Sequence, residues 1–200
     1  HRPPGSAVTP RPIREAIGGR SGFWLLYISS FFMASALFTA FVFMADYVDT
    51  TGTSGSAAVL IGLIGMASIV GRLGLGALAG RVGTLGLYRL SCLGLGLSFL
   101  LWIAAGTSYP LLITFTLVLG VAYGGVIALS PAVVADFFGT IGMGGVLGAL
   151  YTANGLGGLV GPPVMGRIID SSGHTAAQWT AMASGVIGAA LLYRLEPPAA

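Results

Sequence analysis

Six long apolar runs restrict what this 200-residue chain can fold into. Each run reaches the roughly 20 residues that a helix needs to cross the ~30 Å hydrocarbon core of a bilayer. Backbone polar groups find no water there, so a span of this length satisfies them within its own helix. The runs therefore predict an all-α integral membrane protein with six transmembrane helices. The expected spans are about residues 22–45, 56–80, 86–106, 110–135, 144–169 and 176–193.

The composition agrees with a membrane protein. Charged residues make up 8% of the chain and hydrophobic residues 55%, whereas soluble domains carry about 25% charged residues. Thirty-three glycines would weaken soluble helices by up to about 1 kcal/mol each, but between membrane helices small residues allow close approach. Four glycine pairs spaced four residues apart are expected to pack against neighbouring helices: Gly76/Gly80, Gly120/Gly124, Gly144/Gly148 and Gly157/Gly161.

The arginines indicate how the chain is oriented. An even number of spans places both ends on one side, and the positive-inside rule makes the arginine-rich side cytoplasmic. We therefore expect a multi-pass protein of the plasma or inner cell membrane with both termini cytoplasmic, residues 1–20 forming a linker and 195–200 a tail. The expected cytoplasmic side carries Arg2, Arg11, Arg14, Arg20, Arg81, Arg89 and Arg194, and the opposite side Arg167, Asp46, Asp49 and Asp170.

Arg72 lies inside the second apolar run. A guanidinium keeps its charge in proteins, and placing it in hydrocarbon costs about 3 kcal/mol on insertion scales. Such a residue usually faces water, a carboxylate or a bound anion, which makes an anion-binding membrane protein the first hypothesis. Two alternatives remain open, namely a side chain that reaches the cytoplasmic headgroups and a structural ion pair.

Enzyme and nucleic-acid functions find little support in the sequence. The chain has no HExxH zinc motif, no GxSxG elbow and no Walker loop. Neither histidine lies within a span, and His174 is expected in an external loop without a ligand role. Cys92 is the single cysteine, so no disulfide framework is possible. The arginines form no basic stripe beside aromatic residues. We expect no enzymatic activity, no cofactor, no metal and no nucleic-acid partner.

Four stretches resemble the C-terminal six-helix half, helices 7–12, of major facilitator superfamily transporters. RSGFWLLYISSFF (20–32) is similar to the start of helix 7, and GRLGLGALAGRVG (71–83) to helix 8 and its following loop. YGGVIALSPAVVADFFG (123–139) looks like helix 10, and LGALYTANGLGGLVGPPVMGRIID (147–170) like helix 11. Their order, spacing and orientation agree with that half-bundle.

Within the superfamily the sequence is most similar to the monocarboxylate transporters and the oxalate:formate antiporters. In both, an arginine of helix 8 binds the substrate carboxylate, and Arg72 occupies that position. Antiporters for oxalate carry a lysine where Asn154 stands here, and monocarboxylate transporters carry an aspartate where Ser68 stands. The resemblance thus implies one fixed positive charge, suited to one carboxylate, and no proton-coupling acid at position 68.

The resemblance implies a substrate site built from Arg72 and Asn154 with help from Tyr123 and Tyr151. Asn154 could instead bond a neighbouring helix, and the two tyrosines could simply pack. The implied function is secondary active transport of a small organic anion, a monocarboxylate, by alternating access in a lipid membrane.

Only one half of such a transporter is present, so its partner would be the N-terminal six-helix half or a second copy of the chain. The alternative is a truncated or structural six-helix membrane protein without transport activity. A pore is disfavoured because the spans lack rings of polar residues.

Overall fold

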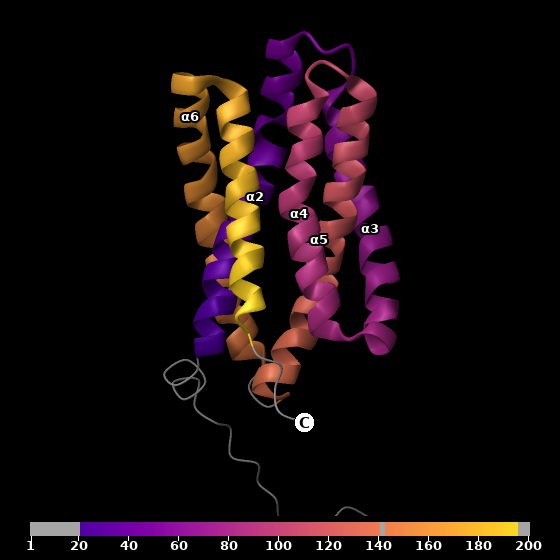
Figure 1. Cartoon of the computed structure of the whole chain (residues 1–200), viewed down its shortest axis with the longest axis vertical. Coiled ribbons are helices and arrows are strands. Elements are labelled where there is room, and N and C mark those ends of the chain that lie inside the picture. Colours follow the sequence, from indigo (N-terminus) through magenta and orange to yellow (C-terminus); the bar gives the residue numbers. More distant parts are fainter. Residues whose placement is uncertain (1–20, 141–142, 196–200) are drawn as a thin grey trace, which may run out of the picture.

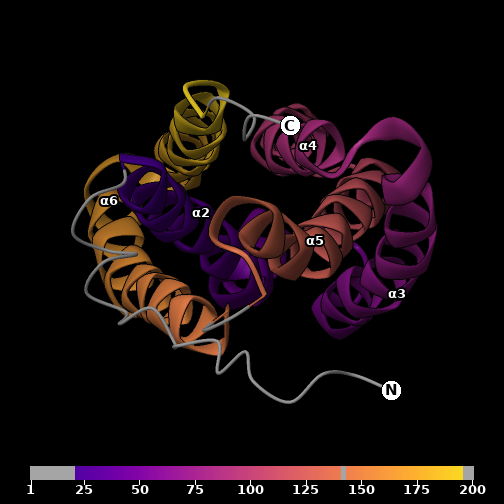
Figure 2. The same cartoon turned by 90° about the horizontal axis from the view of Figure 1, so that it is seen from below.

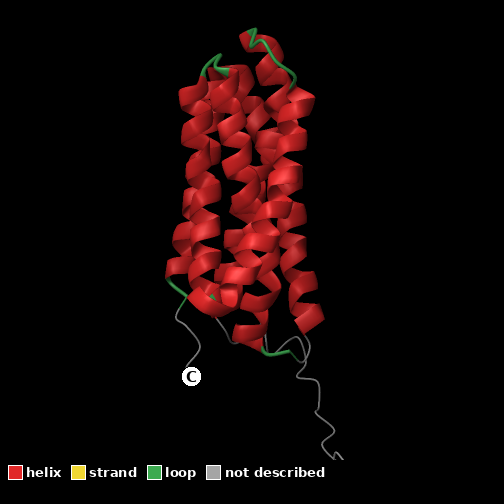
Figure 3. Cartoon of the chain, turned by 90° about the vertical axis from the view of Figure 1, so that its right-hand side faces the viewer, coloured by secondary structure: helices red, strands yellow, loops and turns green. Residues whose placement is uncertain are grey.

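The computed structural model describes residues 21–140 and 143–195. The linker expected at residues 1–20 and nearly all of the expected C-terminal tail lie outside these ranges. Five helices form an upright bundle (Figures 1 and 3), and each is long and apolar enough to cross a membrane. They are α2 (Ser21–Thr51), α3 (Ala57–Val82), α4 (Thr84–Ala105), α5 (Tyr109–Phe138) and α6 (Met143–Tyr193).

The helix α6 corrects the expected number of spans. It is 51 residues long and would extend about 76 Å if straight, more than twice the bilayer core. At Gly173 the backbone leaves helical geometry, with φ 82° and ψ 171°, and the two arms on either side of this residue run back along each other (Figure 1). Six separate helices are not confirmed: residues 21–140 and 143–195 contain five, and the last two expected spans both fall within α6.

Two groups of helices make up the bundle (Figure 2). In the first, α2 packs against both arms of α6. Gly157 and Gly161 permit this contact, because a Cβ atom on Gly161 would lie 2.8 Å from Ser35 Cα. Hydroxyl groups add hydrogen bonds across it, from Ser29 Oγ to the Gly188 carbonyl at 2.7 Å and from Ser184 Oγ to the Phe32 carbonyl at 2.9 Å.

In the second group, α5 packs between α3 and α4. Gly120 and Gly124 of α5 lie against α3, and a Cβ atom on Gly120 would come within 2.6 Å of Ala67 Cβ. The two groups meet where α4 crosses the second arm of α6. There Gly96 faces Gly185, and a Cβ atom on Gly96 would lie 2.8 Å from the Gly185 carbonyl carbon.

The other two glycine pairs do not form the expected packing stripes. A Cβ atom on Gly144, Gly148 or Gly80 would meet nothing within 4 Å, and one on Gly76 would make only an ordinary contact, 3.8 Å from Ala128 Cβ. Spacing by four residues therefore predicts packing for Gly120/Gly124 and Gly157/Gly161 and fails for the remaining two pairs, because the spacing does not tell which face of a helix meets a neighbour.

Arg89 has a structural role beyond the orientation signal that the sequence indicates. Its Nε donates a hydrogen bond to the Leu192 carbonyl at 3.0 Å, and its Nη2 donates one to the Leu195 carbonyl. The guanidinium also lies over the Tyr193 ring, 5.3 Å from the ring centre. The last carbonyls of a helix lack partners and carry partial negative charge. Arg89 of α4 therefore caps the C-terminal end of α6.

At the opposite end of the bundle, His174 joins α6 to α2. Its Nε2 lies 3.2 Å from Asp46 Oδ2 and 3.1 Å from Thr50 Oγ1, and its ring meets Tyr47 edge-on at 5.4 Å. The prediction of a loop histidine is wrong, because α6 resumes directly after Gly173 and includes His174.

Candidate functional site

A cavity of about 350 Å³ lies where the two groups of helices face each other. Such a volume is at the lower end of the range for ligand pockets, about 300–1,000 Å³. Its walls come from α2 and the first arm of α6 on one side and from α4 and α5 on the other. The lining residues are Ser30, Met33, Ala34, Leu37, Phe38, Tyr88, Leu95, Tyr123, Val126, Ile127, Ser130, Tyr151 and Asn154.

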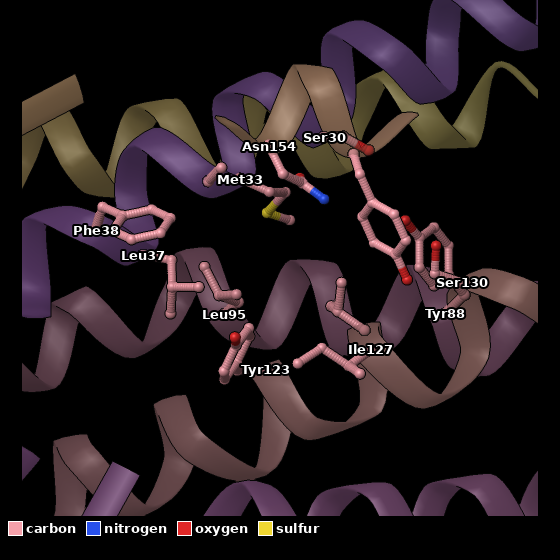
Figure 4. Close-up of a pocket in the computed structure, with 13 residues that line it drawn as sticks. Ser30, Met33, Leu37, Phe38, Tyr88, Leu95, Tyr123, Ile127, Ser130 and Asn154 are labelled. Atoms are coloured by element: carbon pink, nitrogen blue, oxygen red, sulfur yellow. The ribbon is translucent and has the colours of Figure 1, made fainter. Parts of the chain in front are cut away.

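Three of the four predicted site residues line this one cavity. Tyr123 comes from α5, and Tyr151 and Asn154 come from the first arm of α6. Phe41 of α2 holds Tyr123 by an edge-on ring contact at 6.4 Å. The Asn154 amide points into the open centre of the cavity (Figure 4). Residues far apart in the sequence thus meet because α5 and α6 face each other across the bundle.

Arg72 is not among the residues that line the cavity. It is exposed on α3, directly beside the contact between α3 and α5. A Cβ atom on Gly124 would lie 2.9 Å from the Arg72 backbone nitrogen, so the backbone of Arg72 is part of this contact. The cavity residue Tyr123 directly precedes Gly124 in α5. Within the described part of the chain, no ion pair involves Arg72.

Ser68, which stands where the resemblance places an aspartate, has a structural position. Its side chain is 3% exposed, and its hydroxyl donates a hydrogen bond to the Gly65 carbonyl at 2.7 Å. Ser68 packs against Gly124 at the α3–α5 contact, outside the lining of the cavity.

One end of the cavity is polar, a feature that the sequence does not reveal. Tyr88 of α4 is buried and lines this end together with Ser130 of α5 and Ser30 of α2 (Figure 4). Pro131 follows Ser130 inside α5 and has no N–H, so the carbonyl of the cavity residue Ile127 lacks its usual helical partner. The three hydroxyl groups of Tyr88, Ser130 and Ser30 thus gather at this end.

The other end of the cavity is apolar. Leu37 and Phe38 of α2 face Leu95 of α4 there (Figure 4). Phe38 also lies against Gly158 of α6.

The arrangement suits binding more than metal chemistry. Across the described ranges 21–140 and 143–195, no three histidine, cysteine, aspartate or glutamate side chains come together to hold a metal ion. None of the residues that line the cavity carries a formal charge. The cavity can therefore accept a neutral group through hydroxyl and amide hydrogen bonds, with apolar surface for the remainder of a ligand.

A helical bundle of membrane-spanning length with a central cavity has the architecture of a membrane transport protein. Residues 23–200 match the sequence profile of the Major Facilitator Superfamily, and the chain belongs to this family. Monocarboxylate transporter 12 of Rattus norvegicus is 31% identical over 163 residues, covering 78% of this chain and 33% of that protein. Monocarboxylate transporter 3 of the same organism is 31% identical over 175 residues, covering 84% and 36%.

Monocarboxylate transporter 12 of Homo sapiens is 29% identical over 163 residues, covering 78% of this chain and 31% of that protein. The expected resemblance to the superfamily and to its monocarboxylate transporters is confirmed. The chain spans about a third of the length of these relatives.

Proposed function

We propose that the chain is the C-terminal half of a secondary transporter that moves a small monocarboxylate across the plasma or inner cell membrane by alternating access. Arg72 supplies the positive charge for the carboxylate, and Asn154, Tyr123 and Tyr151 bind the rest of the substrate. The observation that carries the proposal is that Tyr123, Tyr151 and Asn154 line the same cavity, in a chain that belongs to a transporter family.

Charge and position support the assignment of Arg72. An unpaired guanidinium within an apolar helix is costly, and a bound carboxylate offsets that cost through charge-assisted hydrogen bonds. Arg72 lies in α3 ten residues before its end at Val82, about 15 Å along the helix axis. An arginine side chain covers only part of that distance, which argues against a purely headgroup-bound residue.

The proposal also includes six membrane crossings, with each arm of α6 crossing once. The first described residues of α2 and the end of α6 lie at the same end of the bundle (Figure 1), as the expected cytoplasmic termini require. The relatives are about three times as long as the matched region. An N-terminal six-helix half, or a second copy of the chain, would complete the transport path.

Uptake by proteoliposomes tests the proposed site. The chain and its Arg72→Gln variant would be reconstituted at matched insertion and supplied with radiolabelled lactate, pyruvate, formate or oxalate. Hydrogen bonds to charged groups contribute about 1.5–3 kcal/mol, so we expect Arg72→Gln to lower uptake of monocarboxylates by about tenfold to a hundredfold.

The matched control is Arg81→Gln, because Arg81 is an exposed arginine in the last turn of the same helix. Equal uptake by the chain and by Arg72→Gln would contradict the assignment of Arg72. No uptake by either form would be the result for a half that lacks its partner, and the same two variants would then be compared in the full-length protein.

A further inference from the structure

The cavity is longer than a three-carbon acid requires. Tyr123 and Ser130 both line it from α5, and their separation of seven residues corresponds to about 10 Å along the helix. A three-carbon acid, with bonds of about 1.5 Å, spans roughly half of that distance. The volume of about 350 Å³ equals that of about twelve water molecules in the liquid. A substrate that reaches both ends must therefore be larger.

The two ends of the cavity differ in what they can bind. Tyr123 lies toward the apolar end, away from the hydroxyl groups of Tyr88, Ser130 and Ser30 (Figure 4). The Arg72 backbone is level with Gly124 along the bundle, whereas Ser130 lies six residues further along α5. The proposed function therefore places the carboxylate toward the Tyr123 end, and the opposite end of the substrate would meet the hydroxyl groups.

The part of the cavity away from the hydroxyl groups favours an aromatic body. Phe38 and Tyr123 contribute aromatic rings there, beside aliphatic surface from Leu37 and Leu95 (Figure 4). Aromatic rings combine large apolar area with favourable edge and offset contacts to other rings. A second charge is disfavoured, because no charged side chain lines the cavity and an unpaired buried charge is costly.

We propose, building on the function above, that the substrate is an aromatic monocarboxylate with a hydroxyl group at the far end of its ring, which binds Tyr88, Ser130 and Ser30. The hydroxyl donates to or accepts from these side chains. Tyr88 is the residue that sets the preference for the hydroxyl, because its buried phenol lies at the polar end together with Ser130 of α5 and Ser30 of α2 (Figure 4).

Matched ligand pairs test this inference. Equilibrium dialysis of the chain in nanodiscs, with empty nanodiscs as the blank, would measure 4-hydroxyphenylacetate against phenylacetate, and the neutral 4-ethylphenol against ethylbenzene. We expect the hydroxylated member of each pair to bind about fivefold to tenfold more tightly, as one additional hydrogen bond allows. Tyr88→Phe should abolish that preference and leave the affinity for the unhydroxylated ligands unchanged.

Two further variants separate the possible outcomes. Tyr193→Phe makes the same change at an exposed tyrosine outside the cavity and should keep the preference. Ser30→Ala removes a second hydroxyl group from the polar end of the cavity and should reduce the preference. Equal binding of hydroxylated and unhydroxylated ligands, or a preference that survives Tyr88→Phe, would overturn the inference.

The neutral pair distinguishes this inference from the proposed function. Tyr88-dependent binding of 4-ethylphenol without binding of either carboxylate would support the hydroxyl site and contradict the carboxylate site at Arg72. Arg72-dependent binding of both carboxylates with equal affinity would support the proposed function and overturn the hydroxyl site.

Discussion

Glycine residues that look alike in the sequence occupy different environments in the bundle. Gly124 sits where α5 meets α3, so that a Cβ atom would lie 2.9 Å from the Arg72 backbone nitrogen. A Cβ atom on Gly148 of α6 would have no other atom within 4 Å. A side chain at Gly124 would push apart the two helices that hold Arg72 and Tyr123 near each other, whereas one at Gly148 would enter open space.

We predict that Gly124→Ala lowers the free energy of unfolding by about 1–3 kcal/mol, the usual cost of overpacking a close contact. Gly148→Ala should leave it unchanged or raise it by up to about 1 kcal/mol, because alanine favours a helix over glycine. Thermal unfolding in detergent would compare the two variants. Equal midpoints for Gly124→Ala and the unmodified chain would show that the α3–α5 contact is looser than the structure indicates.

At the scale of an element, α6 depends on one residue to reverse direction. Gly173 has φ 82° and ψ 171°, a region of backbone geometry that is essentially restricted to glycine. The residues on both sides are helical, and His174 immediately joins the second arm to α2 through Asp46. Because the turn is this short, the strain of any side chain at position 173 cannot be spread over a loop.

We predict that Gly173→Ala destabilises the bundle by about 1–3 kcal/mol, the cost of holding another residue in such a conformation. Gly155→Ala is the matched control, since Gly155 lies in the first arm of α6 with nothing within 4 Å of its added Cβ. The yield of monodisperse protein and its unfolding midpoint would be measured together. A Gly173→Ala variant as stable as Gly155→Ala would refute the requirement for glycine.

For the molecule as a whole, the bundle has two distinct ends (Figure 3). One carries the Gly173 turn of α6 and its contact with Asp46, and the other carries the Arg89 cap on the end of α6. The proposed orientation places the Gly173 end outside and the Arg89 end in the cytoplasm, in agreement with the distribution of arginine.

Cysteine labelling tests this orientation, because the only native cysteine, Cys92, is buried and can be replaced by serine. We predict that Ser172→Cys reacts with a membrane-impermeant maleimide in intact cells, since Ser172 is exposed beside the Gly173 turn. Thr140→Cys, exposed after the end of α5, should react only after permeabilisation. The reverse pattern would invert the proposed topology.

Much of the element pattern follows from local chemistry that the sequence shows directly. Apolar runs of membrane length predict helices, because hydrocarbon leaves the backbone no other partner. The motifs around Arg72 and Asn154 predicted the family that the comparison confirms. The number of separate helices did not follow, because residues 170–175 read as a polar loop whereas the reversal needs only Gly173.

The site is less accessible to sequence reasoning, because it depends on which helix faces meet. Tyr88, Ser30 and Ser130 lie on three helices and look like ordinary polar residues until the bundle brings them to one end of a cavity. Arg89 likewise reads as an orientation signal, and only the position of the α6 terminus makes it a cap. The sequence alone determined the membrane, the helices and the family, since these depend on local hydropathy and motif. The tertiary structure decided the cavity, because helix packing alone sets which distant side chains share it.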